Sequence, residues 1–196
     1  SQNQTIIFQN RSGNTPVVEV ADDSFCNSST EEAILTEGIA SIGRNAFSGC
    51  DKLHQVVLPI SIEEINDSAF ENCRNLKSVS LPGALKTIGN AAFKGTGLRT
   101  IAIPESVFWI GNGVVADCQL LEHVTIPSNM GKVPEHMFEG CINLKKVELH
   151  ERLNEIGERA FFGCSSLDFI VIPDSVKKIG KNAFTNTDKQ FIMQSS

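Results

Sequence analysis

Six cysteines are the residues of this sequence with the widest choice of chemistry, because thiols form disulfides, bind zinc and act as nucleophiles. Five of them hold one fixed place, three residues after a recurring phenylalanine or after the valine that replaces it: Cys50, Cys73, Cys118, Cys141 and Cys164. Equivalent side chains of stacked repeats point the same way, even where Cα atoms come within disulfide range, roughly 4.4–6.8 Å. We therefore expect a buried ladder of thiols whose S–H groups serve backbone carbonyls, rather than disulfides.

Metal binding and catalysis find little support in the pattern of reactive residues. Zinc would need a CxxC motif or a Cys/His cluster, and neither is present. The histidines fall at unrelated points of the repeat, so stacking does not bring them together: His54, His123, His136 and His150. No Gly-x-Ser-x-Gly, phosphate-binding loop or paired carboxylate appears. We expect a non-catalytic protein without metal or cofactor, in which Cys26, one residue after Phe25, is the most reactive thiol.

The elements that position these residues follow a strict repeat. Phenylalanines recur in steps of 22 or 23 residues, with valine in one place: Phe25, Phe47, Phe70, Phe93, Val115, Phe138, Phe161 and Phe184. A fixed period of this length is the signature of a solenoid, in which stacked coils build one continuous core. The spacing predicts about eight coils of 22–23 residues in a single domain spanning residues 1–196. Residues 1–30 form an irregular first coil, 31–187 regular coils and 188–196 an incomplete last coil.

Each coil follows one frame. In residues 76–93, apolar Leu76, Val79 and Leu81 precede Pro82, and then come Ile-Gly and Ala-Phe. Alternation of Val79, Ser80 and Leu81 predicts a short half-buried strand that the proline ends. The Ile-Gly pair suits a turn because glycine tolerates positive φ, and the Ala-Phe region has room for one helical turn. The frame thus predicts one short parallel strand per coil.

Composition excludes several partners. The net charge of -6 argues against a phosphate-binding surface, so we expect no nucleic-acid ligand. No apolar run approaches the roughly 20 residues that span a bilayer, so we expect no membrane insertion. The first residues lack a signal peptide's basic start and apolar middle, which does not exclude secretion.

The repeat resembles a known family. Residues 53–73 are a nearly complete copy of the pattern L-x-x-V-x-L-P-x-x-h-x-x-I-G-x-x-A-F-x-x-C, where h is apolar. The likeness extends over residues 33–187. This pattern resembles the BspA-type (Treponema-type) leucine-rich repeats. The resemblance implies an α/β solenoid wound as a right-handed leucine-rich-repeat superhelix. It also implies a cell-surface or secreted protein, bacterial or protist, that acts in adhesion and protein binding, and it brings no catalytic residues.

Candidate contact residues lie on the outward side of the predicted strands. Small polar residues fill the middle of this face, and a charged stretch and an apolar spot follow toward its C-terminal end. The candidate contact residues are His123, Lys146, Glu148, Phe169 and Val171. The predicted strand at residues 191–193 should lie beside the apolar spot. Such a patch marks either a contact surface or the place of a missing coil, which would allow a homodimer through the open C-terminal end.

One coil departs most clearly from the frame. Phe108 and Trp109 stand where the other coils carry mostly polar residues, and Trp109 is the sole tryptophan. Exposed aromatic residues are common binding anchors. The same coil has Val115 in place of phenylalanine, so one ring could instead refill the core. Both interpretations stay open at this stage.

The leading hypothesis is a protein-binding or adhesion module that uses the strand face to hold a host or matrix protein. A structural spacer within a larger surface protein is the alternative. Carbohydrate binding is a third possibility, which the absence of tyrosine and the single tryptophan make less favoured.

Overall fold

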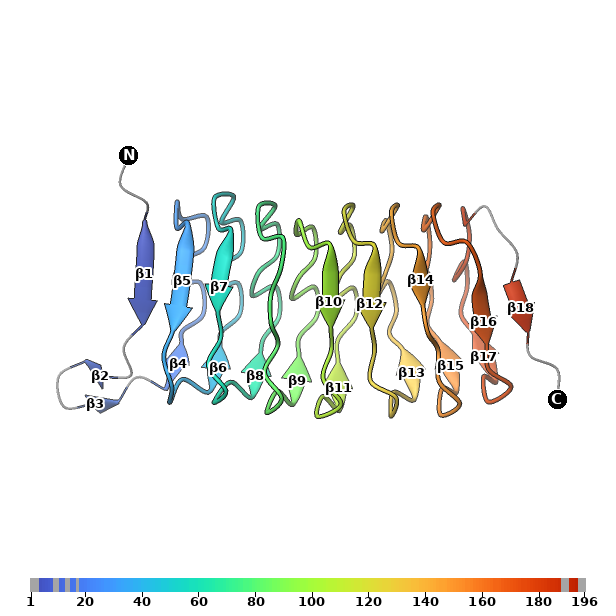
Figure 1. Cartoon of the computed structure of the whole chain (residues 1–196), viewed down its shortest axis with the longest axis horizontal. Helices are drawn as coiled ribbons and strands as arrows, with labels where there is room; N and C mark the ends of the chain where they lie inside the picture. Colours follow the sequence, from blue (N-terminus) through green and yellow to red (C-terminus); the bar gives the residue numbers. More distant parts are fainter. Residues whose placement is uncertain (1–3, 9–10, 13–14, 17, 188–190, 194–196) are drawn as a thin grey trace.

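The computed structural model describes residues 4–8, 11–12, 15–16, 18–187 and 191–193. These residues form coils stacked along one axis, with the two ends of the chain at opposite ends of the stack (Figure 1). Each coil crosses two faces of the stack, and short strands on both faces pair in parallel with those of neighbouring coils. A small antiparallel hairpin of β2 (Arg11–Ser12) and β3 (Thr15–Pro16) interrupts the first coil.

The first face carries the longer strands, in the register that the repeat predicts. Its strands are β1 (Thr5–Phe8), β5 (Glu32–Leu35), β7 (Gln55–Val57), β10 (Thr100–Ala102), β12 (His123–Thr125), β14 (Lys146–Val147), β16 (Ile170–Ile172) and β18 (Phe191–Met193). They form three sheets, β1-β5-β7, β10-β12-β14 and β16-β18. No strand forms at residues 79–81, so the strand predicted there from the alternation of Val79, Ser80 and Leu81 is wrong.

The second face carries a further set of strands, so most coils contain two strands rather than the predicted one. They are β4 (Glu19–Val20), β6 (Ser41–Ile42), β8 (Glu64–Ile65), β9 (Thr87–Ile88), β11 (Trp109–Ile110), β13 (Lys132–Val133), β15 (Glu155–Ile156) and β17 (Lys178–Ile179). One sheet consists of β4, β6, β8, β9 and β11, and another consists of β13, β15 and β17. No pairing joins β11 to β13 in the described part of the chain.

The glycine after these second strands serves close stacking rather than a turn. Gly89 donates its N–H to the carbonyl of Ile65 in the preceding coil at 2.7 Å. A Cβ atom at Gly89 would lie 2.4 Å from the backbone nitrogen of Asp67, far inside van der Waals contact. Its φ is not in the left-handed region, so the interpretation that a positive φ requires glycine after this isoleucine is wrong. Glycine is needed because the preceding coil's backbone occupies the space of a side chain.

The corner that carries each phenylalanine is a pair of tight turns, and the described residues contain no helix. Residues two before and two after each phenylalanine, or Val115, have positive φ, as at Asn45 and Gly49 around Phe47. Left-handed residues at this spacing stop a helical turn, so the predicted helical turn does not form. The backbone bonds instead to the next coil: the N–H of Phe47 donates to the Ala69 carbonyl at 2.8 Å.

The core is a single cluster running the length of the stack. Phenylalanine rings stack face to face with centroids 5.3 Å apart for Phe47 and Phe70 and 5.4 Å for Phe70 and Phe93. A second stack resumes at Phe138, 5.1 Å from Phe161. Such rings bury a large apolar area, and each is shared between neighbouring coils. The solenoid that the phenylalanine spacing predicts is confirmed.

Candidate binding surfaces

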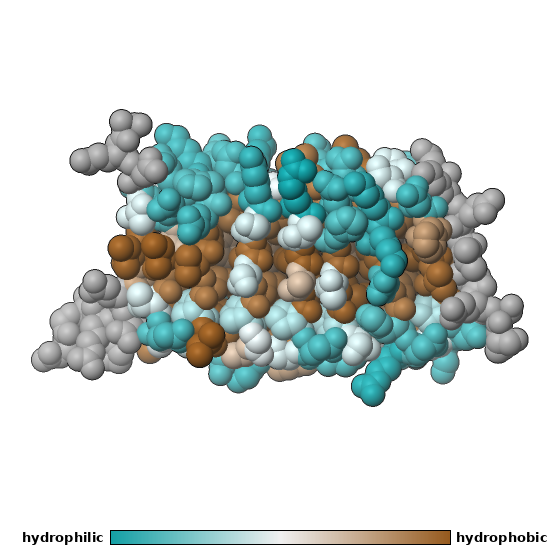
Figure 2. All heavy atoms as spheres, in the orientation of Figure 1, coloured by the Kyte–Doolittle hydropathy of each residue, from teal (hydrophilic) through white to brown (hydrophobic). Residues whose placement is uncertain are grey.

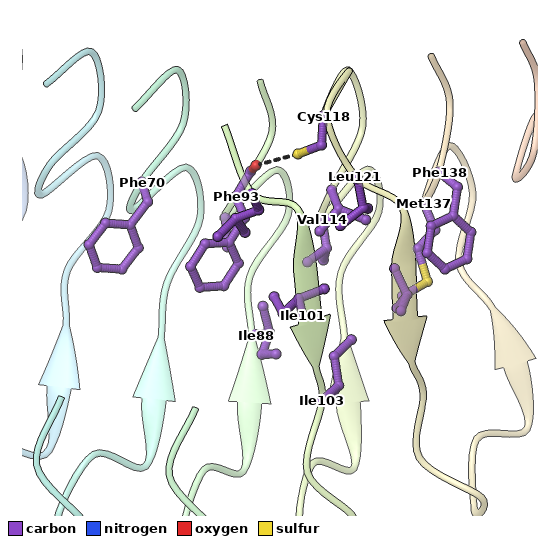
Figure 3. Close-up of a cluster of buried hydrophobic side chains, with 14 of the residues drawn as sticks. Phe70, Ile88, Phe93, Ile101, Ile103, Val114, Cys118, Leu121, Met137 and Phe138 are labelled. Atoms are coloured by element: carbon purple, nitrogen blue, oxygen red, sulfur yellow. Dashed lines mark hydrogen bonds between the residues drawn. The ribbon is translucent and has the colours of Figure 1, made fainter. Parts of the chain in front are cut away.

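The five repeat cysteines form the predicted thiol ladder. All five are buried, and each donates its S–H to the carbonyl of the core residue one coil earlier, as Cys118 does to Phe93 at 3.1 Å (Figure 3). Burial raises the pKa of the Cys118 thiol to about 11 and that of Cys164 to about 12. Burial also raises the pKa of Cys50, Cys73 and Cys141. Their role is to satisfy carbonyl groups inside the core.

Thiol reactivity should single out Cys26. Its sulfur is half-buried, accepts a bond from the Asn27 amide at 3.4 Å and lies outside the ladder. Because the thiolate is the reacting form, neutral buried thiols are inert. We expect Ellman's reagent to titrate one of the six thiols in the native protein and all six in denaturant. The variant Cys26→Ser should leave no fast thiol, and a fast reaction in this variant would contradict the assignment.

The strand face brings three predicted contact residues together. His123 and Lys146 are register partners on β12 and β14, and the Lys146 ammonium lies 2.6 Å from a Glu148 carboxylate oxygen. This hydrogen bond and the charge of Lys146 lower the pKa of Glu148. A shallow pocket of about 250 Å³ lies here, lined by residues of β12 and β14 together with Glu148 and His150. The stretch is polar and charged.

The predicted apolar spot lies at the C-terminal end of the same face. Phe169 is 47% exposed, and Val171 is half-buried on β16. Strand β18 pairs in parallel with β16, with Ile192 opposite Val171, as expected from the repeat. β14 and β16 are not paired, so the charged stretch and the apolar spot belong to separate sheets.

A second apolar surface on this face is absent from the sequence-based set. Ile7, Ile34 and Val57 are consecutive register partners on β1, β5 and β7. Ile7 is 59% exposed and Val57 40%, with Ile34 half-buried between them. Figure 2 shows an apolar band along the middle of this face with polar residues on both sides. We call these three side chains the apolar row.

Phe108 and Trp109 lie on the other face, at β11, and the structure does not bring them near the strand-face residues. Phe108 is 73% exposed and Trp109 47%, so neither ring refills the core and that interpretation is wrong. Val114 and Met137, both fully buried, occupy the core between Phe93 and Phe138 (Figure 3). They stand where neighbouring coils carry alanine, as at Ala92. Larger residues at alanine positions therefore compensate for Val115.

The stacked coils, paired parallel strands and buried ladders define a leucine-rich-repeat solenoid. The BspA type leucine rich repeat region matches the sequence in six copies, over residues 18–141 and 63–191. The chain therefore belongs to the BspA-type leucine-rich-repeat family. This family and its solenoid are typically non-catalytic scaffolds.

Solved bacterial structures agree with this assignment. A leucine-rich repeat protein of Bacteroides ovatus is 31% identical with a TM-score of 0.91, over 95% of this chain and 50% of its own. The Treponema pallidum leucine-rich repeat protein is 32% identical with a TM-score of 0.79, over 90% of this chain and 81% of its own. The pneumococcal vaccine antigen PcpA, 20% identical with a TM-score of 0.62 over 96% of this chain and 60% of its own, shares the fold. The chain thus spans half the length of the Bacteroides protein.

No curated protein matches the sequence. Within the described ranges, no group of histidine, cysteine and acidic residues is arranged to hold a metal ion. The same residues include no helix that is long and apolar enough to span a membrane.

Proposed function

We propose that this chain is the protein-binding module of a cell-surface or secreted bacterial protein, and that it holds a host or matrix protein against its strand face. The observation that carries the proposal is the apolar row. Exposed apolar side chains in adjacent register positions form a continuous strip, and such strips mark interaction surfaces. Membership in the BspA-type family supports both the surface location and the adhesive role.

The surroundings of the apolar row suit a protein partner. Glu32, on β5, accepts a hydrogen bond from the Thr5 hydroxyl at 2.8 Å and lies 3.5 Å from the His54 ring. An apolar centre with a polar rim is the usual composition of protein interfaces. Further along the face, the Lys146–Glu148 pair and Phe169 extend the surface that a large partner would cover. A flat face of this kind suits a macromolecule better than a small ligand.

Binding to matrix proteins should depend on the apolar row. We expect the chain to bind at least one member of an immobilised panel of host extracellular-matrix proteins in surface plasmon resonance. Val57→Glu places a charge within the apolar row, so affinity should fall at least about tenfold, which corresponds to 1.4 kcal/mol. Ile60→Glu is the matched control, because Ile60 is 75% exposed and lies outside the row.

Both variants should keep the far-ultraviolet circular dichroism and thermal midpoint of the parent chain, because both side chains are exposed. Equal affinities of Val57→Glu and Ile60→Glu would remove the apolar row from the proposal. Absence of binding to every matrix protein would instead favour a structural spacer within a longer surface protein.

A further inference from the structure

The missing pairing between β11 and β13 has a cause in the sequence. After β6, β8, β9, β11, β15 and β17, a glycine or asparagine donates its N–H to the preceding coil, as Gly111 does to Ile88 at 2.8 Å and Gly157 to Val133 at 2.8 Å. Pro134 occupies this place after β13 and has no N–H to donate. Among the described residues, the Ile110 carbonyl therefore has no such donor, and the sheet stops at β11. Figure 1 shows β13 set apart from β11, whereas the strands before it are evenly spaced.

Further bonds between these coils are missing at the same place. Elsewhere one carbonyl accepts two bonds from the next coil, as that of Glu63 does from Lys86 at 2.8 Å and Thr87 at 3.2 Å. Phe108 is the equivalent residue of β11's coil, and among the described residues its carbonyl accepts no such bond. The N–H groups of Gly131 and Lys132, which would donate to it, are left without that partner. The break between β11 and β13 therefore has the carbonyls of Phe108 and Ile110 as acceptors on one side and the N–H groups of Gly131 and Lys132 as donors on the other.

A cavity of about 360 Å³ fills this break, lined on one side by Phe108, Trp109 and Asn112 and on the other by Asn129, Gly131 and Lys132. This volume lies within the range of small-molecule pockets, roughly 300–1,000 Å³. Gly131 faces open space: a Cβ atom there would meet nothing within 4 Å. Three departures from the repeat thus coincide at one point, namely an aromatic pair, a glycine and a proline. We call this cavity the indole pocket.

Polar groups in the indole pocket are open to a ligand. Asp67 and Asn90 use their side-chain oxygens to accept backbone N–H groups of the next coil, at 2.7 and 2.8 Å. This ladder ends at Asn112, whose amide oxygen accepts no bond within the described residues. The amide oxygen of Asn129 and the indole N–H of Trp109 likewise have no partner there. The pocket therefore offers both donors and acceptors beside two exposed rings.

The balance of charge favours a neutral ligand. Lys132 is the cation of the pocket, and its ammonium lies 3.2 Å from Glu155 and 3.6 Å from Glu135. Lys178 also lies 3.0 Å from Glu155, so two ammonium groups face two carboxylates, and neither an anion nor a cation finds an unpaired opposite charge there. An extended peptide is also a poor fit, because β11 and β13 are two residues long and offer few ladder bonds.

We propose that the indole pocket binds a neutral carbohydrate, with a pyranose ring stacked on Trp109. A pyranose has an apolar C–H face that suits an indole, and a rim of hydroxyls that donate and accept. Those hydroxyls match the carbonyls of Phe108 and Ile110, the N–H of Gly131 and the amide oxygen of Asn112. This site lies on the opposite face from the apolar row, so a sugar and a protein could be held by one chain.

The sole tryptophan makes the test direct. The chain has one tryptophan and no tyrosine, so tryptophan fluorescence reports on this pocket alone. We would titrate the full chain with lactose, maltotriose, mannobiose and diacetylchitobiose. A saturable change in fluorescence is expected for at least one of them, with a Kd of about 1 mM, because the pocket is shallow.

Gly131→Leu should abolish this change, because the new side chain fills the open space of the pocket while the backbone is kept. Gly83→Leu is the matched control, because a Cβ at Gly83 also meets nothing within 4 Å and lies in a coil away from the pocket. It should bind sugar as the parent chain does. The thermal midpoints of both variants establish that they fold.

Three results would overturn the proposal: no saturable response to any of the four sugars, an unchanged response in Gly131→Leu, or an equal loss in Gly83→Leu. A response to neutral peptides without one to sugars would assign the pocket to a peptide and also overturn it. The variant Val57→Glu should leave the sugar response unchanged, which separates this site from the strand face.

Discussion

Replacing Phe70 with alanine is expected to lower the free energy of unfolding by about 3–5 kcal/mol, the usual loss for a buried aromatic residue. Phe70 is fully buried and stacked between Phe47 and Phe93, so its removal opens a cavity that touches three coils. The neighbouring backbone cannot collapse into this space, because each phenylalanine corner is bonded to the next coil. The free energy of unfolding of a single domain is about 5–15 kcal/mol, so this one substitution removes a large part of the stability of the chain.

Urea unfolding followed by circular dichroism measures this loss. Phe108→Ala removes an aromatic ring of the same size from an exposed site and should change the free energy of unfolding by no more than about 0.5 kcal/mol. A loss for Phe70→Ala as small as that for Phe108→Ala would contradict the view that the phenylalanine stack supports the solenoid.

The features that the sequence predicts well are those that recur in every coil. The phenylalanine stack and the thiol ladder depend on positions repeated every 22 or 23 residues, and stacking places equivalent residues one above the other. The repeat position of Cys118 alone therefore predicts its place in the interior, where its S–H donates to the Phe93 carbonyl. The repeat carries this information because one local environment is copied along the axis.

The backbone between the repeat positions was harder to predict. Asn45 and Gly49 both adopt positive φ, and sequence pattern alone does not distinguish such paired turns from a helical turn. The sequence pattern predicts a positive φ at Gly89, whereas the close approach of the neighbouring coil's backbone is what requires glycine there. Both errors come from judging a residue by its own chain segment, whereas contacts between coils decide its conformation.

The candidate surfaces also combine features that follow the repeat with features that depend on contacts between coils. In the apolar row, Ile34 and Val57 are 23 residues apart, as the repeat requires, whereas Ile7 stands 27 residues before Ile34, with the β2–β3 hairpin between them, so the full row does not follow from the repeat. The aromatic pair of Phe108 and Trp109 is evident in the sequence. Its convergence with Gly131 and Pro134 depends on two coils facing each other across a break, which no single repeat contains.

The compensation around Val115 leads to the last prediction. Val115 interrupts the phenylalanine stack, and its larger neighbours Val114 and Met137 hold places where other coils have alanine. Val115→Phe alone restores the repeat residue but adds a ring to a core that is already filled. We expect it to lower the free energy of unfolding by about 1–3 kcal/mol, the usual cost of overpacking.

The triple variant Val114→Ala, Val115→Phe and Met137→Ala should recover most of that loss, because it exchanges both large neighbours for the alanine that surrounds a phenylalanine elsewhere. Residues that pack together are not additive in their effects, so the recovery appears only in the combined variant. Urea unfolding of the parent chain, Val115→Phe and the triple variant measures it. If Val115→Phe alone stabilised the chain, a cavity would exist at Val115, and Val114 and Met137 would not be its compensation.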